Sequence, residues 1–162
     1  MPDSSRLLAV SEVAHAANCQ WRLWCYLTGN TELEASDVFH RYIGDLTGAE
    51  DEKLAAKYRA AGRVFQTNLT LTSADLTGTL PFLVYEDDSW VLQLARFSAH
   101  ARQDSVNLLA GYAHLARANQ ELLNADFPAL AAKLAHYAQI LLADGKTVDF
   151  PLDELEELWE PI

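Results

Sequence analysis

The sequence is short of cysteine, of basic residues and of long hydrophobic runs, and each shortage excludes a class of protein. Its 162 residues contain two cysteines, Cys19 and Cys25, in a stretch that we expect to be helical. Six positions apart on a helix, the two side chains point about 120° away from each other, so they are not expected to form a disulfide. Reduced thiols are typical of cytoplasmic proteins, and we expect this location.

Basic residues are outnumbered by acidic ones. Lys and Arg together number 12 and Asp and Glu 23, which gives a formal net charge of −11. Proteins that hold nucleic acid by general electrostatics need a basic face, so this balance argues against a protein that binds nucleic acid on its own. The excess of acids suits solubility, and it also suits fast association with a basic partner.

No hydrophobic run approaches the length of a membrane span, so no membrane partner is expected. The apolar stretch after Arg6, Leu7–Val10, is also too short for the core of a signal peptide. Half of the residues are hydrophobic and 22% are charged, as in ordinary globular proteins. This length and composition predict a single domain over residues 1–162.

The first third of the chain has the spacing of helices. Ser11 is a suitable N-cap for a helix over residues 12–27, which Gly29 would end. A second, short helix is expected after Ser36, and a third over residues 49–61, ended by Gly62. The middle of the chain instead has β-branched and aromatic residues in alternation. It predicts three strands, over residues 63–72, 80–85 and 90–97, that form an antiparallel meander.

Helical spacing returns in the last third. It predicts a long helix over residues 104–124 and another from Pro128 to about residue 143, because proline suits the first turn of a helix. A short edge strand over 147–150 and an acidic tail helix over 153–160 complete the pattern. The fold class is therefore α+β, with a three-stranded antiparallel meander flanked by helices.

Several segments, taken in order, carry a resemblance to a known family. The run Ser11–Arg22 resembles an opening helix in which a cysteine is followed by basic and aromatic residues. Thr77–Pro81 resembles a strand that normally reads Gly-x-x-Asp, and Leu94–Ser98 one that reads Glu-x-Lys-Thr-Ser. Asn107–Tyr112 resembles a Gln-x-x-x-Tyr helix, and Phe39-His40 lies where a helical metal-binding histidine is common.

With these segments the chain resembles the RecB-like branch of the PD-(D/E)XK nucleases, which includes the CRISPR-associated exonucleases that trim DNA before spacer integration. The resemblance implies a restriction-endonuclease-like fold. It also implies an active site in which two carboxylates hold a divalent cation and a lysine orients the attacking water.

The chain departs from that pattern at the positions that carry the chemistry. Pro81 stands where the aspartate belongs, Leu94 where the second acid belongs, and Arg96 where the lysine belongs. Proline and leucine cannot bind a hard cation, and an arginine cannot replace a carboxylate. We therefore expect no enzyme activity, no metal and no cofactor, and the absence of cysteine after Cys25 excludes the family's iron–sulfur cluster. The degenerate positions are His40, Pro81, Leu94, Arg96 and Tyr112.

The remaining polar residues have ordinary interpretations. His40 is more simply a helix histidine, and His100, His114 and His136 lack the spacing of a ligand pair. Glu86–Ser89 is interpreted as a hairpin turn, and Asp75 lacks a partner acid. The candidate contacts to phosphate or to a partner, with an ordinary salt bridge as the alternative interpretation, are Arg22, Arg41, Arg96 and Arg102.

Three functions are compatible with these residues. The first is a catalytically inactive nuclease-like module that binds a nuclease, helicase or CRISPR subunit in DNA processing or mobile-element defence, with nucleic acid contacted only within that complex. The second is an acidic inhibitor or immunity-type protein that binds a basic enzyme, with the acids of residues 149–160 as its patch. The third is an active enzyme whose catalytic residues are dispersed along the chain.

Overall fold

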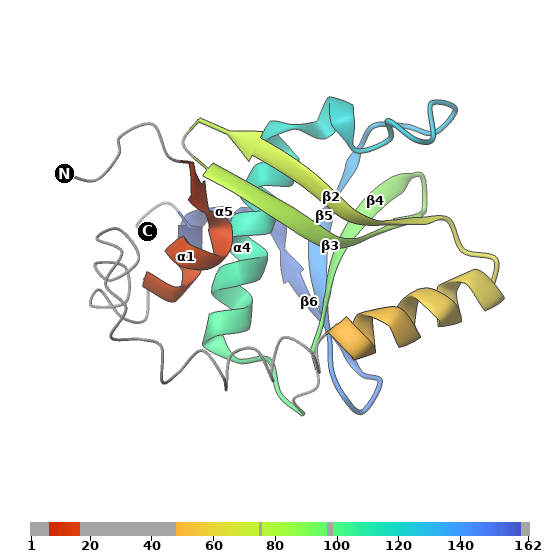
Figure 1. The fold of residues 1–162 in the computed structure, drawn as a ribbon, viewed down its shortest axis with the longest axis horizontal. Helices are drawn as coiled ribbons and strands as arrows, with labels where there is room; N and C mark the ends of the chain where they lie inside the picture. The colour runs from red at the N-terminus through yellow and green to blue at the C-terminus, as the bar shows by residue number, and fades with distance from the viewer. Residues whose placement is uncertain (1–6, 17–47, 75, 97–98, 160–162) are drawn as a thin grey trace.

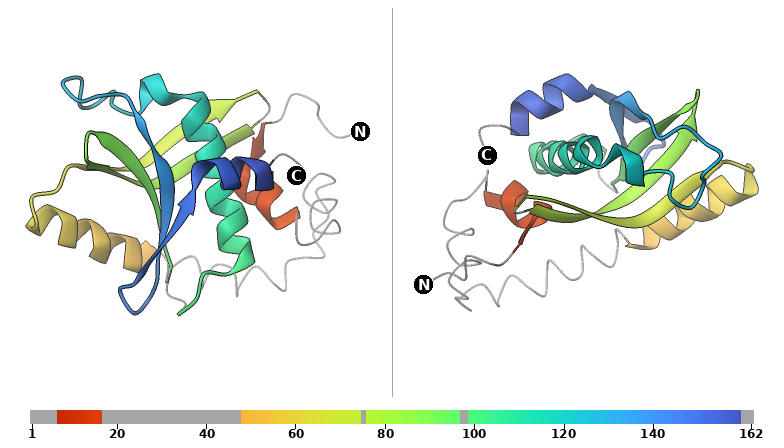
Figure 2. Two further views of the ribbon diagram at one scale, coloured as in Figure 1. Left: turned by 180° about the vertical axis from the view of Figure 1, so that it is seen from behind. Right: turned by 90° about the horizontal axis from the view of Figure 1, so that it is seen from above.

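A mixed six-stranded β-sheet forms the centre of the protein, with helices on both of its faces (Figure 1 and Figure 2). The structure is a computed structural model, and it describes residues 7–16, 48–74, 76–96 and 99–159. One face of the sheet is covered by a helix over residues 48–60, drawn in orange. The opposite face carries α4, Gln103–Ala118, and beyond it α5, Leu152–Trp159.

The predicted meander is present. It consists of β2, Phe65–Ser73, β3, Leu76–Glu86, and β4, Ser89–Ala95, with both pairs of strands antiparallel. Asp87 and Asp88 make the turn between β3 and β4 with φ values of 49° and 60°. Aspartate tolerates this left-handed conformation better than most residues, so the acidic pair marks a hairpin turn.

The sheet extends beyond the meander and is mixed rather than purely antiparallel. β5, Leu134–Leu141, runs parallel to β4, and the intervening α4 makes the crossover that a parallel pair requires. β6, Thr147–Pro151, lies antiparallel to β5 and confirms the predicted edge strand. A two-residue strand, β1, Leu8–Ala9, runs parallel to the start of β3.

The predicted helix from Pro128 to residue 143 is wrong. Pro128 lies in a turn, and the segment that follows forms β5. Its alanines and leucines favour a helix locally, but β5 is hydrogen-bonded on both sides, to β4 and to β6. Ala138 and Ile140 are fully buried there, so pairing and burial in the sheet outweigh the local helix propensity.

The other helices follow the sequence more closely. The helix over 48–60 matches the one predicted over 49–61, and α5 matches the tail helix, with Leu155 and Trp159 buried. α4 ends at Ala118, earlier than predicted, and a single 3-10 turn, η2, Gln120–Leu122, follows it. α1, Val10–Ala16, forms the beginning of the first predicted helix. Its remainder and the helix after Ser36 lie outside the described residues. None of the described helices is long and apolar enough to cross a membrane.

Hydrophobic side chains fill both sides of the sheet. The larger cluster lies between the sheet and the helices α1, α4 and α5. The close approach of these helices depends on Gly111 in α4, because an added Cβ there would lie 2.7 Å from the Trp159 ring and would also collide with Val10. The smaller cluster lies beneath the 48–60 helix and consists of Ala55, Tyr58, Phe82 and Val84.

The side chains of β2 and β3 switch from one face of the sheet to the other at the same point along the paired strands. On β3, Leu80 packs in the larger cluster and Phe82 in the smaller one, although side chains two residues apart normally share a face. The register pairs Leu69 with Leu80 and Thr67 with Phe82, so the change falls between these two pairs. Asn68 lies there with a φ of 57°. This irregularity forms the floor of the pocket described below.

Candidate functional site

Arg96 lies at the end of β4, and the structure holds its side chain firmly. Its backbone N–H donates to the carbonyl of Leu141 on β5 at 2.8 Å. Its guanidinium donates from Nε to Ser105 Oγ at 3.1 Å and from Nη1 to the carbonyl of Ala95 at 3.0 Å. Ser105 is buried in the first turn of α4, so this arginine joins the end of the strand to the start of the helix.

Tyr112 and two carboxylates, Asp51 and Asp104, interact electrostatically with this guanidinium. Burial lowers the pKa of Arg96, while its interactions with Tyr112, Asp51 and Asp104 act in the opposite direction. Burial raises the pKa of the Tyr112 phenol, whereas the interaction with Arg96 lowers it. Arginine stays protonated even with a lowered pKa, so the site contains a fixed positive charge.

Asp51 is the residue of this site that the sequence did not reveal. It comes from the 48–60 helix, and its Oδ1 is shielded from solvent without a hydrogen-bond partner among the described residues. Burial raises the pKa of its carboxyl group, Arg96 lowers it, and neighbouring Glu50 raises it. Asp51 precedes buried Ala55 by four residues, so helical spacing could have placed it on the buried face.

Two of the degenerate positions, Pro81 and Leu94, fall on neighbouring strands but on different faces of the sheet. Pro81 lies on β3 and Leu94 on β4, next to the paired residues Phe82 and Gln93. Leu94 is 3% exposed and packs in the larger cluster, towards α4, and the Arg96 side chain donates to Ser105 of α4. Pro81 instead lines a pocket beneath the 48–60 helix. The structure therefore brings Arg96 and Tyr112 together and places Pro81 on the opposite face of the sheet from Leu94.

Only some of the other candidate residues lie among the described residues. His40, Arg22, Arg41, Asp75 and both cysteines lie outside the described residues. Arg102 is exposed at the N-cap position of α4 and makes no cap hydrogen bond with its side chain. In the hairpin turn, Glu86 accepts a hydrogen bond from Arg63 at 3.1 Å, and Asp87 and Asp88 are exposed.

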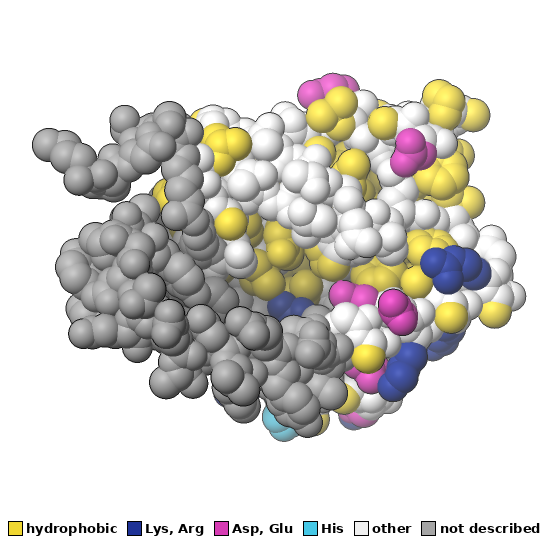
Figure 3. Space-filling view, viewed as in Figure 1, with side chains coloured by type: hydrophobic (Ala, Val, Ile, Leu, Met, Phe, Trp, Pro, Cys, Tyr) yellow, Lys and Arg dark blue, Asp and Glu magenta, His cyan; other side chains and the backbone are white. Residues whose placement is uncertain are grey.

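A pocket of about 520 Å³ opens between the 48–60 helix and the β2–β3 pair. Asp51, Glu52 and Arg59 line it from the helix. Its floor is the part of β2 and β3 where the side chains switch faces. Figure 3 shows this hollow, with acidic side chains and a Lys or Arg side chain near the beginning of the helix and further Lys or Arg side chains along its later turns. The complete lining is Gly48, Asp51, Glu52, Ala55, Arg59, Thr67, Asn68, Pro81 and Phe82.

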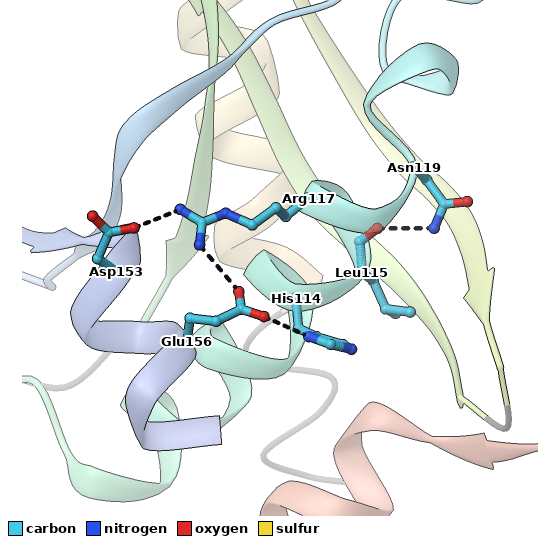
Figure 4. A network of polar contacts seen from close by, with 6 residues as sticks. All are labelled: His114, Leu115, Arg117, Asn119, Asp153 and Glu156. Carbon is cyan, nitrogen blue, oxygen red and sulfur yellow. Dashed lines mark hydrogen bonds and ion pairs between the residues drawn. The ribbon is translucent and has the colours of Figure 1, made fainter. Parts of the chain in front are cut away.

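The acidic tail helix is tied to α4 by ion pairs (Figure 4). Arg117 Nη2 lies 2.9 Å from Asp153 Oδ1, and its Nη1 lies 3.5 Å from Glu156 Oε2. His114 Nδ1 is 2.9 Å from the other carboxylate oxygen of Glu156. Arg117 thus shares its single positive charge between Asp153 and Glu156, and the Asp153 side chain stays 88% exposed.

Within the described ranges, no group of three or more His, Cys, Asp or Glu side chains could hold a metal ion. The arrangement at Arg96 offers a fixed cation, a tyrosine and a carboxyl group, and such a set binds or positions polar groups. Scanned against models of protein families, the chain matches none, and a search of the curated proteins finds no match either.

Proposed function

We propose that this chain is a catalytically inactive nuclease-like module that acts by binding, as a subunit or regulator in DNA processing or mobile-element defence. One observation carries the proposal. Arg96 and Tyr112, at the positions that the resemblance gives to a lysine and a tyrosine, interact electrostatically although they come from β4's end and from α4. A match of sequence segments alone would not require these two side chains to interact.

The order of elements supports the same proposal. A helix, an antiparallel meander of three strands, a crossover helix and a strand parallel to the last of the three follow one another along the chain. We propose that this is a restriction-endonuclease-like arrangement, to which β1, β6, α1 and α5 are added at the periphery. The sequence resemblance gives the segments in the same order.

The chemistry of the site explains why the module would bind rather than cleave. A divalent cation needs oxygen ligands, and the two positions that should supply them carry Pro81 and Leu94. Arg96 already places a positive charge beside the site, and it donates to Ser105 and Ala95. Without a metal there is no activated water, so function falls to the surfaces of the domain.

The partner we propose is a nuclease, a helicase or a CRISPR subunit, with nucleic acid contacted only within that complex. The net charge of −11 opposes tight binding of nucleic acid by the isolated chain, because phosphate contacts need Lys and Arg. A protein partner that supplies the basic surface would remove this obstacle.

A tagged pull-down from the native cell, with bound proteins identified by mass spectrometry, tests this function. Stoichiometric recovery of a nuclease, helicase or CRISPR subunit supports it. The purified chain should also leave single- and double-stranded DNA intact in the presence of Mg²⁺ or Mn²⁺. Metal-dependent cleavage that disappears in Asp51→Asn or Tyr112→Phe would overturn the proposal, and so would stoichiometric recovery of a basic toxin, which would indicate an inhibitor.

A further inference from the structure

The two outer strands of the sheet differ in how well their free edges are protected. Among the described residues, β6 pairs only with β5 and β2 only with β3, so each has one side along which no described strand lies. β6 is five residues long and contains Asp149 and Pro151, and short length, charge and proline all keep an edge strand from pairing. β2 is nine residues long and contains neither a charged residue nor a proline. β2 is therefore the edge that is open to another strand.

The regular part of this edge follows Asn68. The side chains of β2 switch faces there, so the alternation that a paired strand needs runs without interruption over residues 69–73. Leu71 is buried in the larger cluster, towards α4, whereas Thr70 and Thr72 are exposed on the opposite face. A strand added here would form hydrogen bonds with the backbone groups on the free side of this segment.

Threonines already pair across strands on the exposed face. Thr70 Oγ1 lies 2.9 Å from Thr79 Oγ1 on β3, and the register sets Thr72 opposite Thr77. Cross-strand pairs of threonines stabilise antiparallel sheets. In an antiparallel pair, residues that lie opposite each other share a face, so two β2 strands joined over residues 69–73 would place Thr70 of each copy opposite Thr72 of the other. The row of threonines would then continue from one copy into the next.

Exposed hydrophobic side chains flank the same edge. Three large hydrophobic side chains are exposed among the described residues, and two of them, Val64 and Leu122, lie next to β2. Val64 directly precedes the strand, and Leu122 belongs to η2. Gln66 donates to the carbonyl at the end of η2, and Asn119 Nδ2 donates to the carbonyl of Thr72 at 3.0 Å. These two hydrogen bonds hold η2 alongside β2, so a strand added at this edge also approaches Leu122.

We propose that β2 pairs with β2 of a second copy of this chain, antiparallel and two-fold symmetric, over residues 69–73. Leu71 then lies opposite its own counterpart, and the sheets of the two copies form one continuous sheet. A second copy suits this edge better than a strand of another protein, because β2 has no charge with which to attract a partner, whereas its threonines and leucines match their own counterparts. The inference goes beyond the proposed function and does not rest on it.

Sedimentation equilibrium of the full chain tests this pairing. The paired segment is short and the interface is therefore small, so the measurement extends to about 1 mM protein. We expect a mass that rises with concentration towards twice the mass of one chain. Each copy carries a net charge of −11, so sodium chloride should tighten the pairing by screening the repulsion between the copies.

Like charges at the junction should weaken the pairing, and opposite charges should restore it. Thr70→Lys combined with Thr72→Lys places like charges opposite each other, so it should raise the dissociation constant of the dimer about tenfold. Thr79→Lys combined with Thr147→Lys is the matched control, because it adds the same charge at exposed threonines of β3 and β6, and it should leave the constant unchanged. Thr70→Glu combined with Thr72→Glu should weaken the pairing as the lysines do, but an equimolar mixture of the two variants should form dimers. Circular dichroism checks that each variant is folded.

Several outcomes would overturn the inference. They are the mass of one chain at every concentration, a dimer that the paired lysines leave unchanged, equal weakening by the control variant, and a mixture of opposite charges that does not pair. A monomeric chain whose paired lysines abolish recovery of a protein in the pull-down would assign the edge to a strand of that protein instead of a second copy. None of these results decides the nuclease-like function, which the identity of the recovered partner tests separately.

Discussion

Removing the guanidinium of Arg96 should destabilise the fold measurably, and Arg96→Met is the sharpest form of that change. Methionine keeps the length of the side chain but donates no hydrogen bond. The substitution leaves Ser105 Oγ, which belongs to a residue 5% exposed, without its donor, and it frees the carbonyl of Ala95. It also removes the cation that Asp51 and Tyr112 face.

The size of the effect follows from those two hydrogen bonds. A hydrogen bond to a charged group contributes roughly 1.5–3 kcal/mol, and partial exposure of Arg96 reduces this. We expect Arg96→Met to lower the free energy of unfolding by about 2–3 kcal/mol. Arg96→Lys keeps the charge but lacks the planar fork that bonds two acceptors at once, so it should lose about half as much.

Urea denaturation, followed by tryptophan fluorescence, measures these differences. Arg102→Met is the matched control, because Arg102 lies nearby at the start of α4 but is exposed. Its free energy of unfolding should stay within about 0.5 kcal/mol of the wild type, as for most surface substitutions. If Arg96→Met is as stable as Arg102→Met, the guanidinium does not join β4 to α4 in the way described.

Two further changes test other parts of the structure. Gly111→Ala places a Cβ 2.7 Å from the Trp159 ring, so it should lower the free energy of unfolding by about 1–3 kcal/mol, whereas Gly48→Ala, whose Cβ meets nothing within 4 Å, should not lower it. Equal stability of the two variants would refute the close packing of α4 with α5. Burial raises the pKa of the Asp51 carboxyl group above its ordinary value of 3.8, so the folded state binds this proton more strongly than the unfolded state does. The free energy of unfolding therefore falls as pH rises between the unfolded and folded pKa values. Asp51→Asn should therefore gain stability relative to the wild type from acidic to neutral pH in denaturation series. A pH-independent difference would contradict this.

The sequence predicted the meander because its signals, alternating apolar residues and an acidic turn, each lie within a few consecutive residues. Alternation of apolar residues identified the strands, and the acidic turn at Asp87 and Asp88 fixed the hairpin. β5 was mistaken for a helix because its alanines and leucines give no local sign of the two neighbouring strands that pair with it. The change of faces at Asn68 was also beyond prediction, since it depends on a backbone conformation that asparagine adopts in only some contexts.

The residues of the candidate site also divide into those that the sequence revealed and one that it did not. Arg96 and Tyr112, which the sequence resemblance selected, interact electrostatically in the structure, and their role stays a prediction. Asp51 was missed because an acid in the run Glu50–Glu52 resembles a solvated helix start, and its burial arises only when the helix packs on the sheet. Residues that act through tertiary neighbours leave a weaker trace in the sequence than residues that form a motif.

Under the proposed function, the residues at the positions that the resemblance gives to an active site can be compared with what a cation site requires. Two carboxylates held close to each other repel unless a metal ion lies between them. Pro81 and Leu94 carry no charge and lie on opposite faces of the sheet, so this chain has no such pair at these positions, and Leu94 adds to the packing against α4. Arg96 supplies a permanent positive charge. Burial disfavours that charge, and the interactions with Tyr112, Asp51 and Asp104 favour it. An acid at the buried position, as in Leu94→Glu, would place a carboxylate inside the hydrophobic cluster without a partner, so we expect this variant to be strongly destabilised.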